Sequence, residues 1–221
     1  MRNAVLLTAL SALVAVCTGC HTNSGTTQQP SSPAKTSLHP VVLETYDDPD
    51  AYEVYNLLLG GPRPDALIGK TEQGTPTLSR APIEIESQTG GDTLCFDPVA
   101  QPDSRLRQAA TDYDEQNSKP RLLKAGELRI GQKIELISRS DLNSIFADGI
   151  ISGWKKFRDI HPNVQGYTRL SAVGFSPDKN VAVVFLGRYC GPTCGAGGIV
   201  TLSRKNGIWR RNWDDFCSWI S

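Results

Sequence analysis

The stretch that decides the fold is residues 181–213, VAVVFLGRYCGPTCGAGGIVTLSRKNGIWRRNW. Its first five residues are apolar on both faces of an extended chain, which predicts a central strand with helices packed on at least one side. Apolar or alternating runs at 199–203 and 208–213 predict two more strands. Asn206-Gly207 lies between them and is typical of a type I′ hairpin turn.

The residues just before this stretch extend the sheet. Residues 170–175 form a further apolar run, and the turn-forming segment 176–180, SPDKN, separates it from the central strand. Successive apolar runs divided by short turns predict an antiparallel meander in the C-terminal third of the chain.

Helices are predicted before the meander. Asp48 is a good N-cap and Pro49 suits a first turn, so a helix is expected to begin there and to end at Gly60-Gly61. Short helices are also expected at 140–146 and at 152–160. In the second of these, the apolar side chains expected to face the core are Trp154, Phe157 and Ile160.

Two short strands and one polar segment complete the N-terminal part. Ile83-Glu84-Ile85 alternates and suggests an edge strand, and Lys133–Ser138 alternates in the same way. The charged segment Asp103–Asn117 is expected to form a surface helix or an ordered loop. The predicted fold class is α+β, with a C-terminal antiparallel β-meander covered by helices.

The N-terminus carries an export signal. Arg2 precedes the apolar run AVLLTALSALVAV at residues 4–16, and Cys-Thr-Gly-Cys follows, with Gly19 just before Cys20. This arrangement resembles a bacterial lipoprotein signal, which implies that residues 1–19 are removed and that Cys20 is acylated as the mature N-terminus. The alternative is an ordinary secretory signal that is cut after Cys17.

Composition sets the remaining organisation. Residues 20–40 hold the lipidated cysteine and a Ser, Thr, Gln and Pro-rich tether that is expected to be disordered, and residues 41–221 are expected to form a single globular domain. The chain has 23 Lys and Arg residues and 23 Asp and Glu residues, so it has no excess of positive charge that would favour binding to nucleic acid. Contact with the membrane is expected through the N-terminal lipid.

Cysteine number agrees with an oxidising compartment. Of the six cysteines, Cys17 and Cys20 belong to the signal and its lipidation site, which leaves an even number. Several pairings are possible, and we expect Cys190 with Cys194 and Cys95 with Cys217, because close neighbours across a tight loop meet most easily.

The segment that ends in Cys-Gly-Pro-Thr-Cys also resembles a thioredoxin active site. It departs from that pattern by one extra residue between Cys190 and Cys194, and by a strand instead of a helix after the second cysteine. A structural disulfide is therefore the preferred interpretation. The glycine-rich segment 195–198 could present amides to an anion, but close backbone approach beside a strand explains it better.

No catalytic or metal-binding motif stands out. The histidines at 21, 39 and 161 are far apart, no His-Glu-x-x-His occurs, and neither a cofactor nor a metal site is predicted. The acidic cluster of Asp112, Asp114 and Glu115 is best explained as a solvated helix face.

A possible binding patch comprises Trp209, Trp213 and Arg211 near the Asn-Gly hairpin. Trp and Arg are common interface anchors, but charges at an ordinary hairpin tip explain the pattern better.

A second resemblance concerns the folded part. Asp50-Ala51-Tyr52-Glu53-Val54-Tyr55, and the spaced residues from Trp154 to Trp209, are similar to a set of uncharacterised exported bacterial domains, and this resemblance implies no activity.

The expected function is a lipid-anchored extracytoplasmic protein that binds an unidentified cell-envelope partner or has a structural role. His21 after the acylated cysteine implies the outer membrane. The alternative is a secreted hydrolase with an acid pair that the sequence does not reveal.

Overall fold

The computed structural model describes residues 42–60, 82–91, 94, 97, 99–212 and 216–221, all of which belong to one compact unit, Val41–Ser221. Its helices are α1 (Pro49–Gly60), α2 (Ser104–Gln116), the 3-10 helix η2 (Ala125–Glu127), α3 (Arg139–Ile145) and α4 (Ile150–Ile160). Its strands are β1 (Ile83–Glu86), β2 (Ile134–Ile137), β3 (Tyr167–Leu170), β4 (Gly174–Phe175), β5 (Val181–Gly191), β6 (Cys194–Lys205), β7 (Ile208–Arg211) and β8 (Phe216–Ile220).

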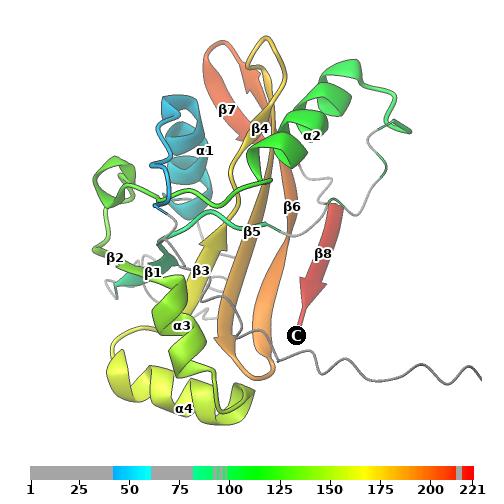
Figure 1. Ribbon diagram of the computed structural model, residues 1–221. Coiled ribbons are helices and arrows are strands. Elements are labelled where there is room, and N and C mark those ends of the chain that lie inside the picture. The colour runs from blue at the N-terminus through cyan, green and yellow to red at the C-terminus, as the bar shows by residue number, and fades with distance from the viewer. Residues whose placement is uncertain (1–41, 61–81, 92–93, 95–96, 98, 213–215) are drawn as a thin grey trace, which may run out of the picture. The chain divides into compact units, whose positions relative to one another are not determined.

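The strands form one mixed sheet in the order β2-β1-β3-β5-β6-β7, with β4 also on β5 and β8 also on β6 (Figure 1). The C-terminal meander is antiparallel, as predicted. The sheet as a whole is not, because β1 pairs in parallel with both β2 and β3. The fold is therefore mixed α/β.

The position of β1 corrects one prediction. The alternation of Ile83-Glu84-Ile85 suggested an edge strand, but β1 lies between two strands and all four of its residues are buried. Ile83 and Ile85 join the main core. Glu84 and Glu86 point to the opposite face, where Arg139 and Arg169 take the place of water around Glu86, and His161 contacts Glu84.

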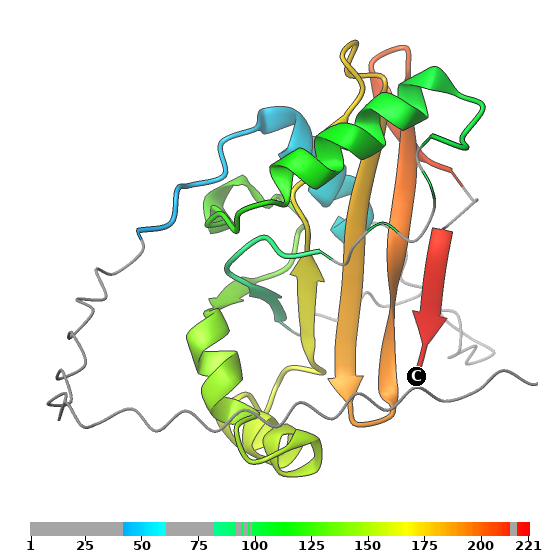
Figure 2. The ribbon, with the colours of Figure 1, turned by 45° about the vertical axis from the view of Figure 1, so that its right-hand side comes forward.

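Helices cover both faces of the sheet. Alternate residues of β5 separate the two layers, since Ala182 and Val184 pack with α1, while Val183 and Phe185 pack with α2. Figure 2 shows α2 crossing in front of β5 and β6, with α1 behind the sheet. The helices α3 and α4 form a third cluster around Phe157, together with Ile137 at the end of β2.

The helices α1 and α2 begin where the sequence predicted. Asp48 caps α1, since its Oδ1 accepts a hydrogen bond from the Asp50 backbone N–H at 3.0 Å. Asp103 caps α2 through the Arg105 backbone N–H at 2.9 Å. One core assignment is wrong, because Ile160 at the last turn of α4 is 53% exposed.

The central hairpin is longer than predicted. Strand β5 continues to Gly191 and β6 begins at Cys194, so the cysteine segment is the turn itself and not a separate loop. At the other end of β6, Asn206 and Gly207 have φ values of 52° and 77°, which confirms the type of turn predicted there.

Candidate functional site

A row of aromatic rings extends from α4 across β3 and β5 to β8. Trp154 of α4 stacks on Tyr167 of β3 with ring centroids 5.9 Å apart, and Tyr167 stacks on Tyr189 of β5 at 5.0 Å. Tyr189 in turn contacts Trp219 of β8 at 5.5 Å. Rings from distant parts of the chain therefore form one continuous platform.

This aromatic row lines a groove of about 420 Å³. The rest of its wall is mostly apolar, with lining residues Phe146, Ile150, Gly191, Pro192, Cys194 and Ser221. Ile150 stands at the start of α4 and is 58% exposed, so an apolar side chain is open to solvent in the groove wall. The groove has the size and the mostly apolar lining of a ligand site, and none of the described residues that line it has a charged side chain.

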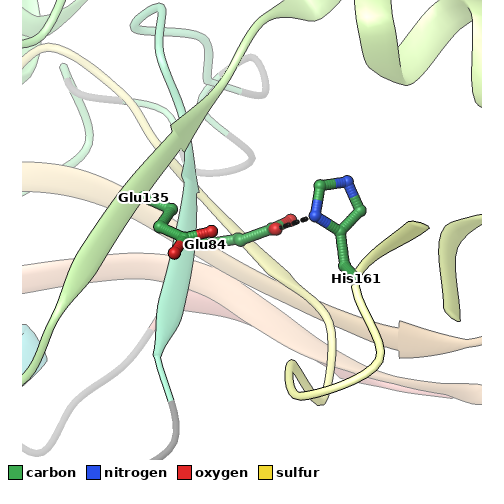
Figure 3. Close-up of side chains that lie close together, drawn as sticks. All are labelled: Glu84, Glu135 and His161. Carbon is green, nitrogen blue, oxygen red and sulfur yellow. Dashed lines mark ion pairs between the residues drawn. The ribbon is translucent and has the colours of Figure 1, made fainter.

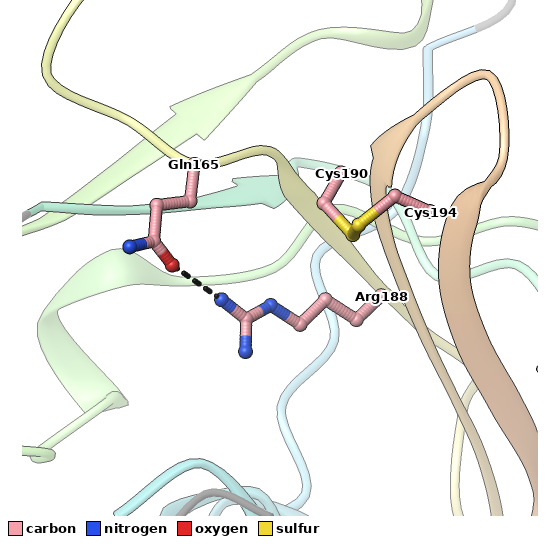
Figure 4. The surroundings of a disulfide bond; sticks show 4 residues. All are labelled: Gln165, Arg188, Cys190 and Cys194. Atoms are coloured by element: carbon pink, nitrogen blue, oxygen red, sulfur yellow. Dashed lines mark hydrogen bonds between the residues drawn. A yellow bond between two sulfur atoms is a disulfide. The ribbon is translucent and has the colours of Figure 1, made fainter. Parts of the chain in front are cut away.

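A disulfide closes the turn beside the groove. Cys190 and Cys194 are bonded, with their Cα atoms 5.0 Å apart, which confirms the predicted pair. Figure 4 shows the bond near Arg188, whose guanidinium donates a hydrogen bond of 3.0 Å to the Gln165 side-chain oxygen. The disulfide fixes the end of the β5–β6 hairpin and so one wall of the groove.

The glycine-rich segment has a packing role. A Cβ on Gly195 would lie 2.9 Å from the Trp219 ring, and a Cβ on Gly198 would lie 2.9 Å from the Ser218 Cα. Gly197 is similarly confined by the backbone of Gly187 at 3.0 Å. The close backbone approach that the sequence suggested is confirmed, and its purpose is to admit β8.

Two buried carboxylates project from β1 toward the same face as the aromatic row. Glu86 is fully buried, and its two oxygens accept hydrogen bonds from Arg139 at 2.5 Å and from Arg169 at 2.7 Å. Arg169 also lies over the Tyr189 ring, 5.6 Å from its centroid. Glu86 therefore connects β1, β3 and the start of α3 to the aromatic row.

Glu84 has different surroundings. Figure 3 shows its carboxylate directed at His161, whose Nδ1 forms an ion pair with Oε1, and Glu135 of β2 lies alongside. Burial, and next the charge of Glu135, raise the pKa of Glu84 to about 7. A hydrogen bond from Lys133 lowers the pKa of the Glu135 carboxyl. This cluster holds two adjacent acids and one imidazole.

A second, polar hollow lies beside α2. Its lining includes two members of the predicted acidic cluster, Asp112 and Glu115. Asp112 has a structural role, since its Oδ2 accepts a hydrogen bond of 2.7 Å from the Phe175 backbone N–H. Asp114 and Glu115 are exposed, as expected for a solvated helix face.

One residue of the predicted patch is buried in the structure. Trp209 is 6% exposed and packs on Phe175 in the main core, with ring centroids 5.8 Å apart. A tryptophan buried in this way serves the sheet and cannot anchor a partner. Arg211 is exposed, and Trp213 lies outside the described residues.

Two other predicted sites also fall outside the described part of the chain. These are Cys20, the lipidation site, and Cys95. Cys217 is disulfide-bonded, but its predicted pairing with Cys95 stays a prediction.

Neither the groove nor the carboxylate pair could be predicted from a local sequence pattern. Their residues come from separate segments, and no local motif joins Glu84 to His161 or Tyr167 to Trp219. The one available signal was the repeated glutamate within an otherwise apolar strand, since a buried acid requires a compensating partner.

Comparison with known proteins yields no relative: no family model, no curated protein and no solved structure matches the chain. Within the described residues, none of the helices combines the length and the apolar character needed to cross a membrane.

Proposed function

We propose that this chain is a lipid-anchored protein of the bacterial cell envelope whose folded domain binds a protein partner through the aromatic groove. The observation that carries the binding role is the row of rings that lines the groove, in which Tyr167, Tyr189 and Trp219 are partly exposed and Trp154 is buried. Tryptophan and tyrosine are the residues on which protein interfaces most often depend. The export signal and the disulfide at Cys190–Cys194 support an extracytoplasmic location.

The chemistry of the groove indicates the kind of partner. Its walls are aromatic and aliphatic, and its polar members are few, so an apolar or aromatic side chain of the partner would bury the most surface there. A substrate that must be recognised through many hydrogen bonds would find few groups to satisfy them.

The alternative function, a secreted hydrolase, has one candidate acid pair in the structure. Glu84 and Glu135 are opposite each other in the pairing of β1 with β2. Neither of them lines the aromatic groove or the hollow beside α2. Neither of these two hollows brings a substrate to the acid pair, whereas the aromatic groove is open to a partner, so binding is the better supported function.

Photo-crosslinking in living cells tests the groove. One probe is a benzoylphenylalanine at position 150, in the groove wall near the Cys194 end of β6. A benzoylphenylalanine at position 208, beside the other end of β6, is the matched control. The two replaced side chains are similarly exposed, Ile150 at 58% and Ile208 at 61%. We expect one discrete adduct from position 150 and none from position 208. The adduct should be lost when Tyr189→Ala or Trp219→Ala is added. Equal adducts at both positions, or an adduct that survives these substitutions, would contradict binding in the groove.

Acyl labelling tests the anchor separately. Cys20→Ala should abolish incorporation of labelled palmitate and release the protein from the membrane fraction, whereas Cys17→Ala should leave both unchanged. Retention of Cys20→Ala on membranes, with a mature N-terminus at Thr18, would support the ordinary secretory signal instead.

A further inference from the structure

We propose that Glu84, Glu135 and His161 form a binding site for a divalent transition-metal ion, with Zn²⁺ as the best match. One potential ligand atom from each residue lies within 4.8 Å of the others. The three residues come from β1, from β2 and from the position that ends α4, so the folded sheet brings them together. This site is distinct from the aromatic groove, and nothing in it rests on the proposed function.

The state of the Glu84 carboxylate points to a ligand. The side chain is 1% exposed, and neither of its oxygens has a hydrogen-bond partner among the described residues. Among the described residues, the His161 imidazole is the one group that pairs with it, through Nδ1 and Oε1. A buried carboxylate without hydrogen bonds is costly, and Glu135, directly opposite in the strand pairing, adds a second negative charge.

Glu86 provides the internal comparison. It is on the same strand and on the same face, it is as deeply buried, and two arginines satisfy both of its oxygens. Lys133 contacts Glu135 at 2.5 Å, but no arginine or lysine contact of Glu84 is found in the described part of the chain. A bound cation would give Glu84 the compensation that Glu86 receives from Arg139 and Arg169.

The ligand types select the ion. Two carboxylates and one imidazole suit Zn²⁺, which bonds histidine nitrogen and carboxylate oxygen at about 2.0–2.2 Å. Mg²⁺ and Ca²⁺ prefer sites made only of oxygen. Three protein ligands leave a fourth tetrahedral position for a water molecule.

The site also has an entry path. The side chains of His161 and Glu135 are 21% and 40% exposed, so an ion can approach from the side opposite the buried Glu84. The His161 ring is held by its contact with Phe157, with ring centroids 4.9 Å apart. The imidazole is therefore oriented before an ion arrives.

Equilibrium dialysis of the full chain against ZnCl₂, under non-reducing conditions, tests the proposal. We expect one Zn²⁺ per chain, with Ca²⁺ and Mg²⁺ binding far more weakly, and an increase in Tm with added Zn²⁺. Glu84→Gln, Glu135→Gln and His161→Gln should each weaken binding by at least about tenfold, since each removes a ligand. Co²⁺ in the same site should give visible absorption bands that these substitutions abolish.

Matched controls make the result decisive. Glu53→Gln changes an exposed glutamate far from the site and should leave Zn²⁺ affinity unchanged. Glu135→Gln changes a partly exposed residue, so it reports on the site even if Glu84→Gln does not fold. The proposal is overturned if the folded wild-type chain binds no stoichiometric Zn²⁺, or if the ligand substitutions bind it as tightly as Glu53→Gln does.

Discussion

Trp219 lies over Gly195, and this pairing of the largest side chain with the smallest residue allows β8 to reach the aromatic row. Gly195 is opposite Tyr189 in the β5–β6 register, and the missing Cβ leaves room for the indole to contact the Tyr189 ring at 5.5 Å. The groove therefore depends on a position that has no side chain of its own.

Gly195→Ala should damage this arrangement. The new Cβ would lie 2.9 Å from the Trp219 ring and 3.1 Å from the Arg188 carbonyl oxygen, so the indole must move. We expect a loss of about 1–3 kcal/mol in the free energy of unfolding, measured by urea denaturation. Gly126→Ala is the control, because nothing lies within 4 Å of its new Cβ, and it should be neutral or slightly stabilising. Equal effects of the two substitutions would argue against the packing role of Gly195.

Glu86→Gln should destabilise the sheet more than the loss of a surface ion pair does. The substitution removes the charge that Arg139 and Arg169 share in a buried setting, and we expect a loss of about 2–3 kcal/mol. This loss is smaller than the cost of breaking a fully buried ion pair, because the two arginine side chains are 36% and 33% exposed. Glu53→Gln breaks an exposed pair with Arg204 and should cost less than about 1 kcal/mol. Similar unfolding curves for the two variants would count against a structural role for Glu86.

The disulfides should contribute unequally to stability. The Cys190→Ser, Cys194→Ser double variant opens a short ring and should lose about 2 kcal/mol, with the change confined to the hairpin end. Cys217→Ser should lose more, because its predicted partner Cys95 closes a much larger ring. Non-reducing peptide mapping identifies the pairs, and thermal unfolding compares the variants. Equal losses would refute the predicted pairing.

Alkaline pH should unfold the domain through its buried tyrosines. Burial raises the pKa of Tyr55 well above its ordinary value of 10, and burial also raises the pKa of Tyr46. Because the folded-state pKa exceeds that of the unfolded chain, stability is complete below about pH 10 and falls as the pH rises, by about 1.4 kcal/mol per pH unit for each such group. Urea denaturation at a series of pH values measures this slope. Tyr55→Phe should reduce the slope, and an unchanged slope would contradict this account.

Local signals in the sequence predicted the elements better than their arrangement. Asp48 before Pro49, and Asn206-Gly207, predicted the start of α1 and the β6–β7 turn correctly, since caps and tight turns depend on neighbouring residues. The place of β1 could not be found in this way, because the partners of Glu86 are 53 and 83 residues away along the chain. The alternation of β1 looks the same in sequence as that of an edge strand, because the half-buried arginines that neutralise Glu86 come from distant segments.

The groove escaped prediction for a related reason. Trp154 was expected in the core, where it is, but its alignment with Tyr189 and Trp219 depends on the register of β5, β6 and β8. The possible binding patch at Trp209 rested on tryptophan and arginine as common interface anchors. Residue type does not reveal which face of β7 meets the core.

The pairing of β1 also has a consequence for how the chain reaches its native state. The β5–β6 hairpin joins residues that are close in sequence, so it can form early. Strand β1 must pair with β2 and β3, which are far from it along the chain, and non-local pairing of this kind slows folding. We therefore expect β1 to be inserted late. Glu84 and Glu86 would then leave water only when β1 enters the sheet, so the burial of both carboxylates would coincide with the last step of folding.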